Sequence, residues 1–538
     1  EADGHQGISV TLDVRDLTFM GVAAVIRAGI FSTVGAAAYQ GGPGVVFLFI
    51  ITAAVCGFTA LCYAEFAGRV PVSGSAYTYS YVTFGEVVAW IIGWALILEY
   101  AIGNVVVAIS WSSYFTNILR AFGINMPTWL AADPLTAKEI FDHALQTGQS
   151  TDGLAWATAP VIGGWHVIMN IPATLIVVAV TALVYIGIQE SKKAANLMVM
   201  VKLVILGAVA LIGLFYIKGA NYVPFLPHGM GGVLKGVSAV FFAYIGFDAI
   251  STTAEECKDP QRDLPRSMMY ALIICTVIYC VTALVLTGMV PSAEFKGVMD
   301  PLAFVFNRID LPVVGFAVSV GAVLAATSVL LVFQLGQPRI WMSMSRDGLL
   351  PPRFGHLHRK FGTPAFATIV TGVLVGVPAL FAPSGIITDL TSIGTLFAFT
   401  LVCGGVLLLP RADALDASGR KRFKIPYING RFILPLLVLA YFALDRERLL
   451  NAVTNMHLDR QAILLTAFAV FALGTAVQAF RRRYSLIPCI GMLSCAYLMI
   501  EIPAKSWLVF FGWMALGLAV FFLYSRRHSK LGEEAAEG

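Results

Sequence analysis

The stretch "AAVIRAGIFS", residues 23–32, decides the fold because it sets a permanent charge, Arg27, inside an otherwise apolar segment. Arg27 lies eleven residues after Asp16, where that segment begins. At about 1.5 Å per residue, the helical depth is roughly 16 Å, and half the hydrocarbon core of a bilayer is about 15 Å. Arg27 is therefore expected near the midplane, where an arginine costs about 2.5–3.5 kcal/mol on insertion scales and must face protein or water.

The composition of the whole chain indicates a membrane protein. Of its 538 residues, 58% are hydrophobic and 12% are charged, whereas soluble proteins carry about 25% charged residues. Apolar runs of about 20 residues recur along the chain, which is long enough for helices that cross a bilayer, and no segment alternates like a barrel strand. We predict an all-α polytopic membrane protein with about 14 spans. The predicted spans cover residues 16–38, 44–68, 82–116, 167–188, 192–217, 232–256, 265–291, 311–338, 364–382, 389–410, 431–446, 461–480, 485–501 and 506–525.

The distribution of charge predicts the orientation of these spans. With the N-terminus in the cytoplasm, most of the 36 Lys and Arg residues fall in cytoplasmic segments, as the positive-inside rule requires. Two of the 36, Arg27 and Lys202, are assigned to neither side and remain inside the membrane. We expect a multi-pass protein of the plasma (inner) membrane with both termini in the cytoplasm. The basic segments lack interleaved aromatic residues, so no nucleic-acid partner is predicted.

A second interrupted segment indicates an internal repeat. In "FFAYIGFDAIST", residues 241–252, Gly246 and Asp248 interrupt span six. Spans one and six are the first members of two five-span blocks, and glycine-interrupted spans in matching positions are typical of inverted-repeat transporters. We predict a cytoplasmic segment 1–15, a first five-helix repeat 16–217 with an outer loop 117–166, a second repeat 218–410, four further spans in 411–525 and a cytoplasmic tail 526–538.

Several longer stretches resemble a known family. They are "GGPGV" (41–45), "ALCYAEFAGRVPVSGSAYTYSYVTFGE" (60–86), "GWALILEY" (93–100), "FFAYIGFDAISTTAEECKDPQRDLP" (241–265), "SRDGLLP" (345–351) and "IGTLFAF" (393–399). They resemble the amino acid–polyamine–organocation superfamily, and in particular the cationic amino acid transporters and their bacterial homologues. The resemblance implies a leucine-transporter-type 5+5 inverted repeat plus four C-terminal transmembrane helices. It also implies secondary amino acid transport by alternating access, with no enzymatic activity, no catalytic residue, no metal and no cofactor.

The resemblance also implies a substrate site. Span one of the family normally reads Gly-x-Gly-Ile-Phe, and its exposed backbone N–H groups hold the substrate carboxylate; here the string is Arg27-Ala28-Gly29-Ile30-Phe31, so the first glycine is missing. The remaining site residues that the resemblance implies are Phe242, Ile245 and Asp248 in span six, Glu99 and Tyr100 in span three, and Phe333 in span eight. Two alternatives remain open: Asp248 caps a helix end, and Glu99 is a structural partner of a buried hydrogen-bond donor.

Two residues bear on coupling and specificity. Lys202 matches the span-five lysine of the family, which implies proton coupling with the proton as the coupling ion; the alternative is an interfacial lysine that snorkels. A large side chain at Phe333 shortens the space for a long substrate, so small neutral L-amino acids are favoured, with cationic amino acids next.

Three interpretations of Arg27 remain open. It forms a buried pair with Glu99 or Asp248, or it binds the substrate carboxylate as a fork, or it fills the site and impairs transport. The alternative function is therefore a transport-impaired, substrate-sensing or channel-like member of the same fold. Expected partners are an amino acid and the lipid bilayer, and the resemblance also allows a small single-span membrane protein.

Overall fold

The computed structural model describes residues 13–26, 29–69, 85–187, 192–247, 250, 257, 259–408, 423–455 and 459–529. These ranges are almost entirely helical, with one antiparallel hairpin of β1 (Val161–Ile162) and β2 (Trp165–His166). The longer helices are α1 (Val14–Val25), α3 (Val34–Gly41), α4 (Val45–Arg69), α6 (Glu86–Ala121), α7 (Pro134–Thr147), α9 (Ile171–Tyr185), α10 (Lys192–Leu214), α12 (Val237–Tyr244), α13 (Pro260–Met289), α14 (Pro301–Arg308), α15 (Pro312–Arg346), α16 (Ala365–Phe381), α17 (Ser384–Leu408), α18 (Gly430–Leu444), α19 (Arg446–Asn455), α20 (Arg460–Arg482), α21 (Leu486–Ile500) and α22 (Ala504–Val520). Shorter pieces are α2 (Gly29–Ser32), α8 (Ala155–Thr158), α11 (Gly229–Lys235) and α23 (Arg526–His528).

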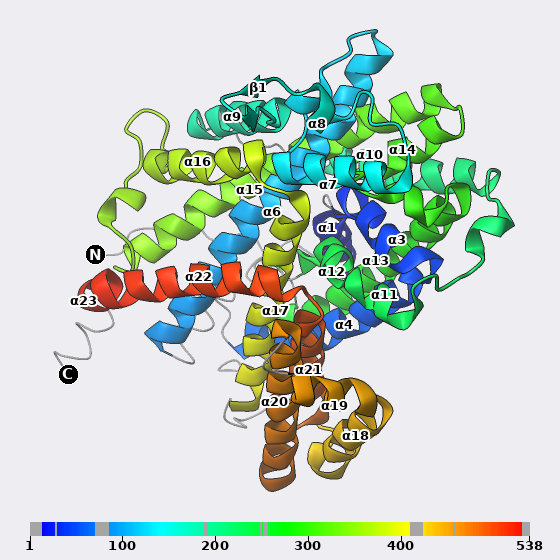
Figure 1. The fold of residues 1–538 in the computed structure, drawn as a ribbon. Coiled ribbons are helices and arrows are strands. Elements are labelled where there is room, and N and C mark those ends of the chain that lie inside the picture. The colour runs from blue at the N-terminus through cyan, green and yellow to red at the C-terminus, as the bar shows by residue number, and fades with distance from the viewer. Residues whose placement is uncertain are drawn as a thin grey trace.

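Figure 1 shows α6 running obliquely through the middle of the molecule. In this view α9 and α16 lie to the left of the upper part of α6. The helices α1, α3, α12 and α13 gather on one side of α6, and α18 to α21 form a projection below. By length and apolar composition, seven helices in the described ranges are able to cross a membrane, and five more are shorter apolar helices. The expected all-helical polytopic architecture is confirmed.

Span one is broken where the sequence predicts it. Asp13 starts α1 with a capping box, in which its side chain accepts hydrogen bonds from the backbone N–H groups of Arg15 and Asp16. The helix ends at Val25, because Ile26 turns out of the helix with φ −75° and ψ 59°. Helical structure resumes at Gly29 and continues through α2 and α3.

Span six is broken in a similar way. Its first half is α12, which ends at Tyr244, and Ile245 takes φ −58° and ψ 133°. Gly246 then adopts φ +116°, a conformation that side-chain-bearing residues rarely take. Both interruptions predicted from glycine-containing segments are therefore present, one in each half of the chain.

The main departure from the predicted spans is in α15. The predicted span eight, 311–338, ends at Pro338, and a proline within a helix removes a backbone donor and clashes with the preceding turn. Instead α15 continues through Pro338 to Arg346. The proline leaves the carbonyl of Gln334 without its usual helical donor, which is tolerable in a helix that neighbouring helices enclose. The hairpin β1–β2 and the short helix α19 are further elements that hydropathy did not predict.

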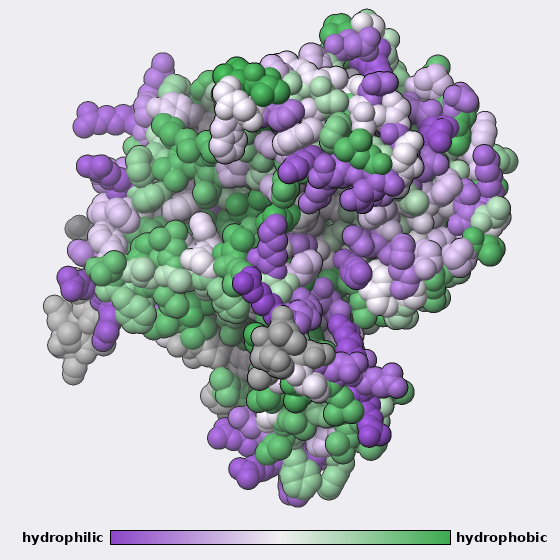
Figure 2. All heavy atoms as spheres, in the orientation of Figure 1, coloured by the Kyte–Doolittle hydropathy of each residue, from purple (hydrophilic) through white to green (hydrophobic). Residues whose placement is uncertain are grey.

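The C-terminal helices are joined to the first repeat by tryptophans. Trp94 of α6 stacks on Trp513 of α22 with centroids 4.8 Å apart, and its indole N–H donates to the Trp513 carbonyl at 2.8 Å. Large apolar side chains cover much of the surface in Figure 2. On α18, for example, Phe432 and Leu436 are each 68% exposed. Such a surface is suited to contact with lipid rather than water.

Candidate functional site

The two broken helices touch each other at Gly29. A Cβ atom placed on Gly29 would lie 2.3 Å from the Cα of Ala243 and 2.8 Å from its nitrogen. Real Cβ atoms do not approach backbone so closely, so α2 and α12 meet here with no room for a side chain. Gly29 therefore has a packing reason for being glycine, in addition to the substrate-binding role that the resemblance implies.

A tyrosine from α13 holds the two breaks together. The hydroxyl of Tyr279 lies 3.0 Å from the carbonyl oxygen of Val25, the last residue of α1. It lies 2.9 Å from the carbonyl oxygen of Ala243, near the end of α12. Helix ends leave carbonyls without intrahelical donors, and Tyr279 is fully buried. This hydroxyl thus serves the freed carbonyls of both broken spans.

The resumed part of span one is fixed by hydroxyl groups from two other helices. Thr33 donates to the carbonyl of Ala239 on α12 at 2.7 Å. Tyr114 of α6 donates to the carbonyl of Phe31 at 2.7 Å. The backbone around Gly29 is therefore positioned from both sides. The leading N–H groups of α2 have no acceptor within that helix, and such groups are able to bind an anion such as a carboxylate.

Aromatic side chains from three helices lie beside the breaks. Tyr100 of α6 and Phe333 of α15 form an edge-to-face pair with centroids 5.5 Å apart and planes at 79°. One turn along α6 from Tyr100, a Cβ on Gly103 would be 3.7 Å from the ring of Phe242 and 3.4 Å from the methyl of Thr391 on α17. The structure thus groups Tyr100 with Phe333, and places Phe242 against the same helix.

The other residues proposed for the site fall into three groups. Ile30 is fully buried and Ile245 is 5% exposed. Glu99 and Lys202 are buried ionisable side chains, 4% and 3% exposed, so Lys202 does not extend to the surface in the way that a snorkelling lysine would. Arg27, Ala28 and Asp248 lie outside the described residues.

Two features near the site were missed by the sequence reading. One is Tyr279. The other is a chain of amides and a hydroxyl, in which Asn104 donates to Gln334 at 3.2 Å and Gln334 donates to Thr181 on α9 at 2.6 Å. These bonds join α6, α9 and α15 directly behind Phe333. The two glutamines in "VFQLGQPR" (332–339) could have indicated this chain of hydrogen bonds, since amide side chains are uncommon in an apolar span.

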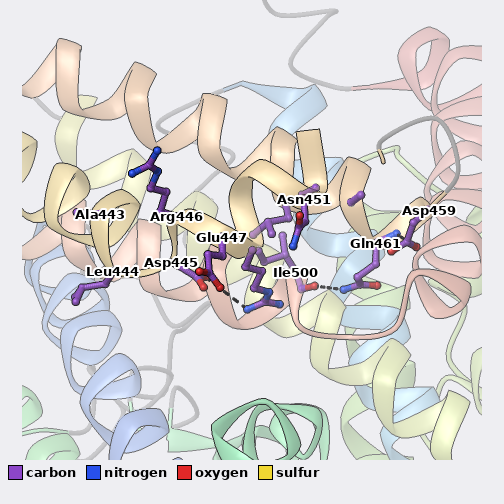
Figure 3. A pocket seen from close by; sticks show the side chains of 13 residues that line it. Ala443, Leu444, Asp445, Arg446, Glu447, Asn451, Asp459, Gln461 and Ile500 are labelled. Carbon is purple, nitrogen blue, oxygen red and sulfur yellow. Dashed lines mark hydrogen bonds and ion pairs between the residues drawn. The ribbon is translucent and has the colours of Figure 1, made fainter. Parts of the chain in front are cut away.

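A cavity of about 750 Å³ lies elsewhere. Figure 3 shows it between the ends of α18, α19 and α20, with Asp445, Glu447 and Gln461 among its lining residues. Arg448 also lines it and binds the carboxylate of Glu501 with two hydrogen bonds of 2.8 and 2.9 Å. This bidentate pair raises the pKa of Arg448. The cavity is polar and remote from the broken helices, so it belongs to the packing of the C-terminal helices.

Comparisons with known proteins agree with this architecture. The profile of the family described as "Amino acid permease" matches residues 12–455, and the profile for the C-terminus of that family matches residues 484–529. The crystal structure of MhsT in complex with L-phenylalanine, a transporter of the leucine-transporter fold, is similar with a TM-score of 0.50 and 14% identity. That similarity covers 76% of this chain and 94% of the other, and it shows the fold.

Curated relatives match over almost the whole chain. The branched-chain amino acid permease BcaP of Bacillus subtilis is 35% identical over 530 residues, covering 98% of this chain and 96% of the relative. The methylthioribose transporter of the same organism is 35% identical over 529 residues, with the same coverage. Cationic amino acid transporter 3 (mitochondrial) of Arabidopsis thaliana is 30% identical, covering 98% of this chain and 92% of the relative. The chain therefore belongs to the amino acid permease family, within the amino acid–polyamine–organocation superfamily, and is a membrane transporter rather than an enzyme.

Proposed function

We propose that the protein is a secondary active transporter of a neutral, aliphatic L-amino acid that works by alternating access and is coupled to protons. The observation that carries the substrate class is the edge-to-face pair of Tyr100 and Phe333, one turn of α6 from Gly103, which faces the ring of Phe242. Two aromatic rings in contact present mostly apolar surface, which suits an aliphatic side chain. A cationic side chain there would exchange its hydration for ring faces and the Tyr100 hydroxyl, which compensate it less well than a carboxylate would.

The relatives support the same substrate class. A permease for branched-chain amino acids and a methylthioribose transporter are equally similar to this chain, and neither name refers to a cationic substrate. Cationic amino acid transporters of Arabidopsis are 29–31% identical where the match covers almost the whole chain, and one is 35% identical over 80% of this chain. We therefore rank leucine, isoleucine and valine together with alanine as the first candidates, and lysine and arginine after them.

In this proposal the substrate is bound at the two breaks. The N–H groups that begin α2 hold its carboxylate, since helix N-termini favour anions. Carbonyls near the end of α12 receive its ammonium group, and Phe242 and Phe333 enclose its side chain. The cationic side chain of Arg27 is near this position in the sequence, and we propose that it pairs with a buried carboxylate rather than obstructing the substrate.

The proposed coupling residue is Lys202 on α10. Its side chain is buried within an apolar helix, and ionisable residues in such positions commonly belong to proton pathways. We therefore expect Lys202→Ala to abolish accumulation driven by an inward proton gradient. Exchange of substrate across the membrane without a gradient should persist. Lys218→Ala, on an exposed residue after the same helix, is the matched control.

The substrate proposal is tested by uptake of labelled leucine, alanine, lysine and glutamate into proteoliposomes with an inward proton gradient. Leucine should give the highest uptake. Phe333→Ser should increase the uptake of lysine relative to leucine, because it removes one wall of the site. Phe316→Ser is the control, since Phe316 is also on α15 and also forms an edge-to-face pair, with Phe122. Lysine preferred by the unmodified protein, or equal effects of both serine variants, would contradict the proposal.

A further inference from the structure

A groove runs between α17 and α20, two helices that are apolar and long enough to cross a membrane. It has a volume of about 620 Å³. Its walls are mostly apolar, and glycines at positions 404, 405 and 474 give it depth. Gly474 is exposed on α20, and a Cβ placed there would meet no atom within 4 Å. The groove therefore has room for another molecule beside Gly474.

A polar cavity of about 430 Å³ lies next to the groove. Leu407 and Tyr484 line both hollows, so the two are adjacent. The polar cavity is also lined by Lys424 and Arg482, and Arg482 forms no ion pair in the part of the chain that the structure describes. One acidic side chain, Glu65, lines it as well, and its carboxylate accepts the backbone N–H of Ile425 at 3.1 Å.

The polarity of the groove changes in order along α20. Phe471 and Gly474 lie in its apolar part, Thr475 and Gln478 follow, and Arg482 ends the helix at the polar cavity. From Phe471 to Arg482 is eleven residues, or roughly 16 Å of helix. One leaflet of the hydrocarbon core is about 15 Å thick. Along α20 the lining therefore passes from apolar to cationic over about the thickness of one leaflet.

We propose that this groove binds one anionic glycerophospholipid of the membrane, with an acyl chain in the slot and the phosphate at Lys424 and Arg482. Basic pockets between transmembrane helices bind such headgroups on the cytoplasmic side. The three arginines at the end of α20, Arg481 to Arg483, favour the cytoplasmic side for this end by the positive-inside rule. The occupant is a lipid and not a soluble phosphate because the apolar slot, which is larger than the polar cavity, would otherwise stay unfilled.

The bound lipid would connect the transport core to the added helices. The groove is lined by α6 at Val88, by α17 and by α20 and α21, including Met492 of α21. A lipid seated there fills the space between the tenth span and the C-terminal helices. This inference concerns a site separate from the substrate site, and it stands whether or not the proposed substrate is correct.

Native mass spectrometry of the purified protein tests the proposal, using micelles that contain equal amounts of phosphatidylglycerol and phosphatidylcholine with the same acyl chains. The unmodified protein should retain phosphatidylglycerol preferentially. Each of Arg482→Gln and Lys424→Gln should weaken that preference about fivefold, since one basic group near the surface contributes about that factor. Arg359→Gln, at an exposed loop residue outside the groove, should leave the preference unchanged.

A second variant tests the slot. Gly474→Leu should displace both lipids, because its side chain enters the open groove. Gly512→Leu is the matched control, since Gly512 is likewise exposed, helical and free of neighbours within 4 Å. Thermal stabilisation by phosphatidylglycerol should be lost in Gly474→Leu, and glycerol phosphate should not replace the lipid. Equal retention of both lipids by the unmodified protein, stabilisation by glycerol phosphate alone, or equal effects of both leucine variants would overturn the proposal.

Discussion

Removing the hydroxyl of Tyr279 should weaken the junction of the two broken helices. In Tyr279→Phe the carbonyls of Val25 and Ala243 both lose their donor, at 3.0 and 2.9 Å. A hydroxyl has one proton, so one hydrogen bond is lost at a time, and a buried acceptor left unsatisfied costs about 1–3 kcal/mol. If the substrate site depends on this junction, the affinity for leucine should fall by roughly 5- to 150-fold.

The assay is leucine binding to detergent-purified protein, with thermal unfolding measured in parallel. Tyr222→Phe is the control, because the Tyr222 hydroxyl also donates to a main-chain carbonyl, that of Leu284 at 2.7 Å, but outside the breaks. It should leave leucine affinity unchanged. The reasoning is refuted if Tyr279→Phe binds leucine like the unmodified protein and loses no more stability than Tyr222→Phe.

Three further predictions concern packing, protonation and the amide chain. Gly29→Ala should abolish leucine binding, and adding Ala243→Gly should not restore it, because the closest contacts of the new methyl are with backbone atoms at 2.3 and 2.8 Å. Burial raises the pKa of Asp300 in the folded protein. Because the unfolded chain then loses this proton at lower pH than the folded protein, folding stability should fall as pH rises from about 3.9 through the raised pKa. Asp300→Asn should remove this dependence of thermal unfolding on pH. Gln334→Leu leaves Asn104 without its acceptor and should lower the free energy of unfolding by about 1–3 kcal/mol.

Matched variants control for these effects. Gly207→Ala is the control for Gly29→Ala, because a Cβ at Gly207 meets nothing within 4 Å, and it should bind leucine normally. Asp152→Asn, in an exposed part of the outer loop, should leave the pH slope intact. Gln146→Leu, at an exposed position of α7, should be close to neutral in stability. Equal effects in a pair would count against the structural reason given for that pair.

Features of the fold that depend on residues close together in the sequence were predictable from it. Apolar runs of span length predict the transmembrane helices, and glycines within two of them predict the breaks after Val25 and Tyr244. The end of α15 was not predictable by the same local rule. Pro338 normally ends a helix, but the surrounding helices support α15 as far as Arg346. Tertiary packing there outweighs the local preference.

The site was only partly accessible to sequence reasoning. The pairing of Tyr100 with Phe333 joins residues that the family resemblance had already named. Tyr279 is different, because its role depends on a carbonyl that lies 254 positions earlier in the chain. The bond between Asn104 and Gln334 spans 230 positions. No local pattern indicates which tyrosine or amide faces which helix, so these residues emerge only once the helices are packed.

Counterflow in proteoliposomes tests the central claim most directly. Vesicles are loaded with unlabelled leucine or with unlabelled lysine, and the entry of labelled leucine is followed with no ion gradient present. We predict a transient accumulation of labelled leucine only in the leucine-loaded vesicles, because alternating access couples the exit of one substrate molecule to the entry of another. Arg27→Gly should retain this exchange. Entry that does not depend on the internal amino acid, or exchange that appears only in Arg27→Gly, would contradict transport of a neutral amino acid by this chain.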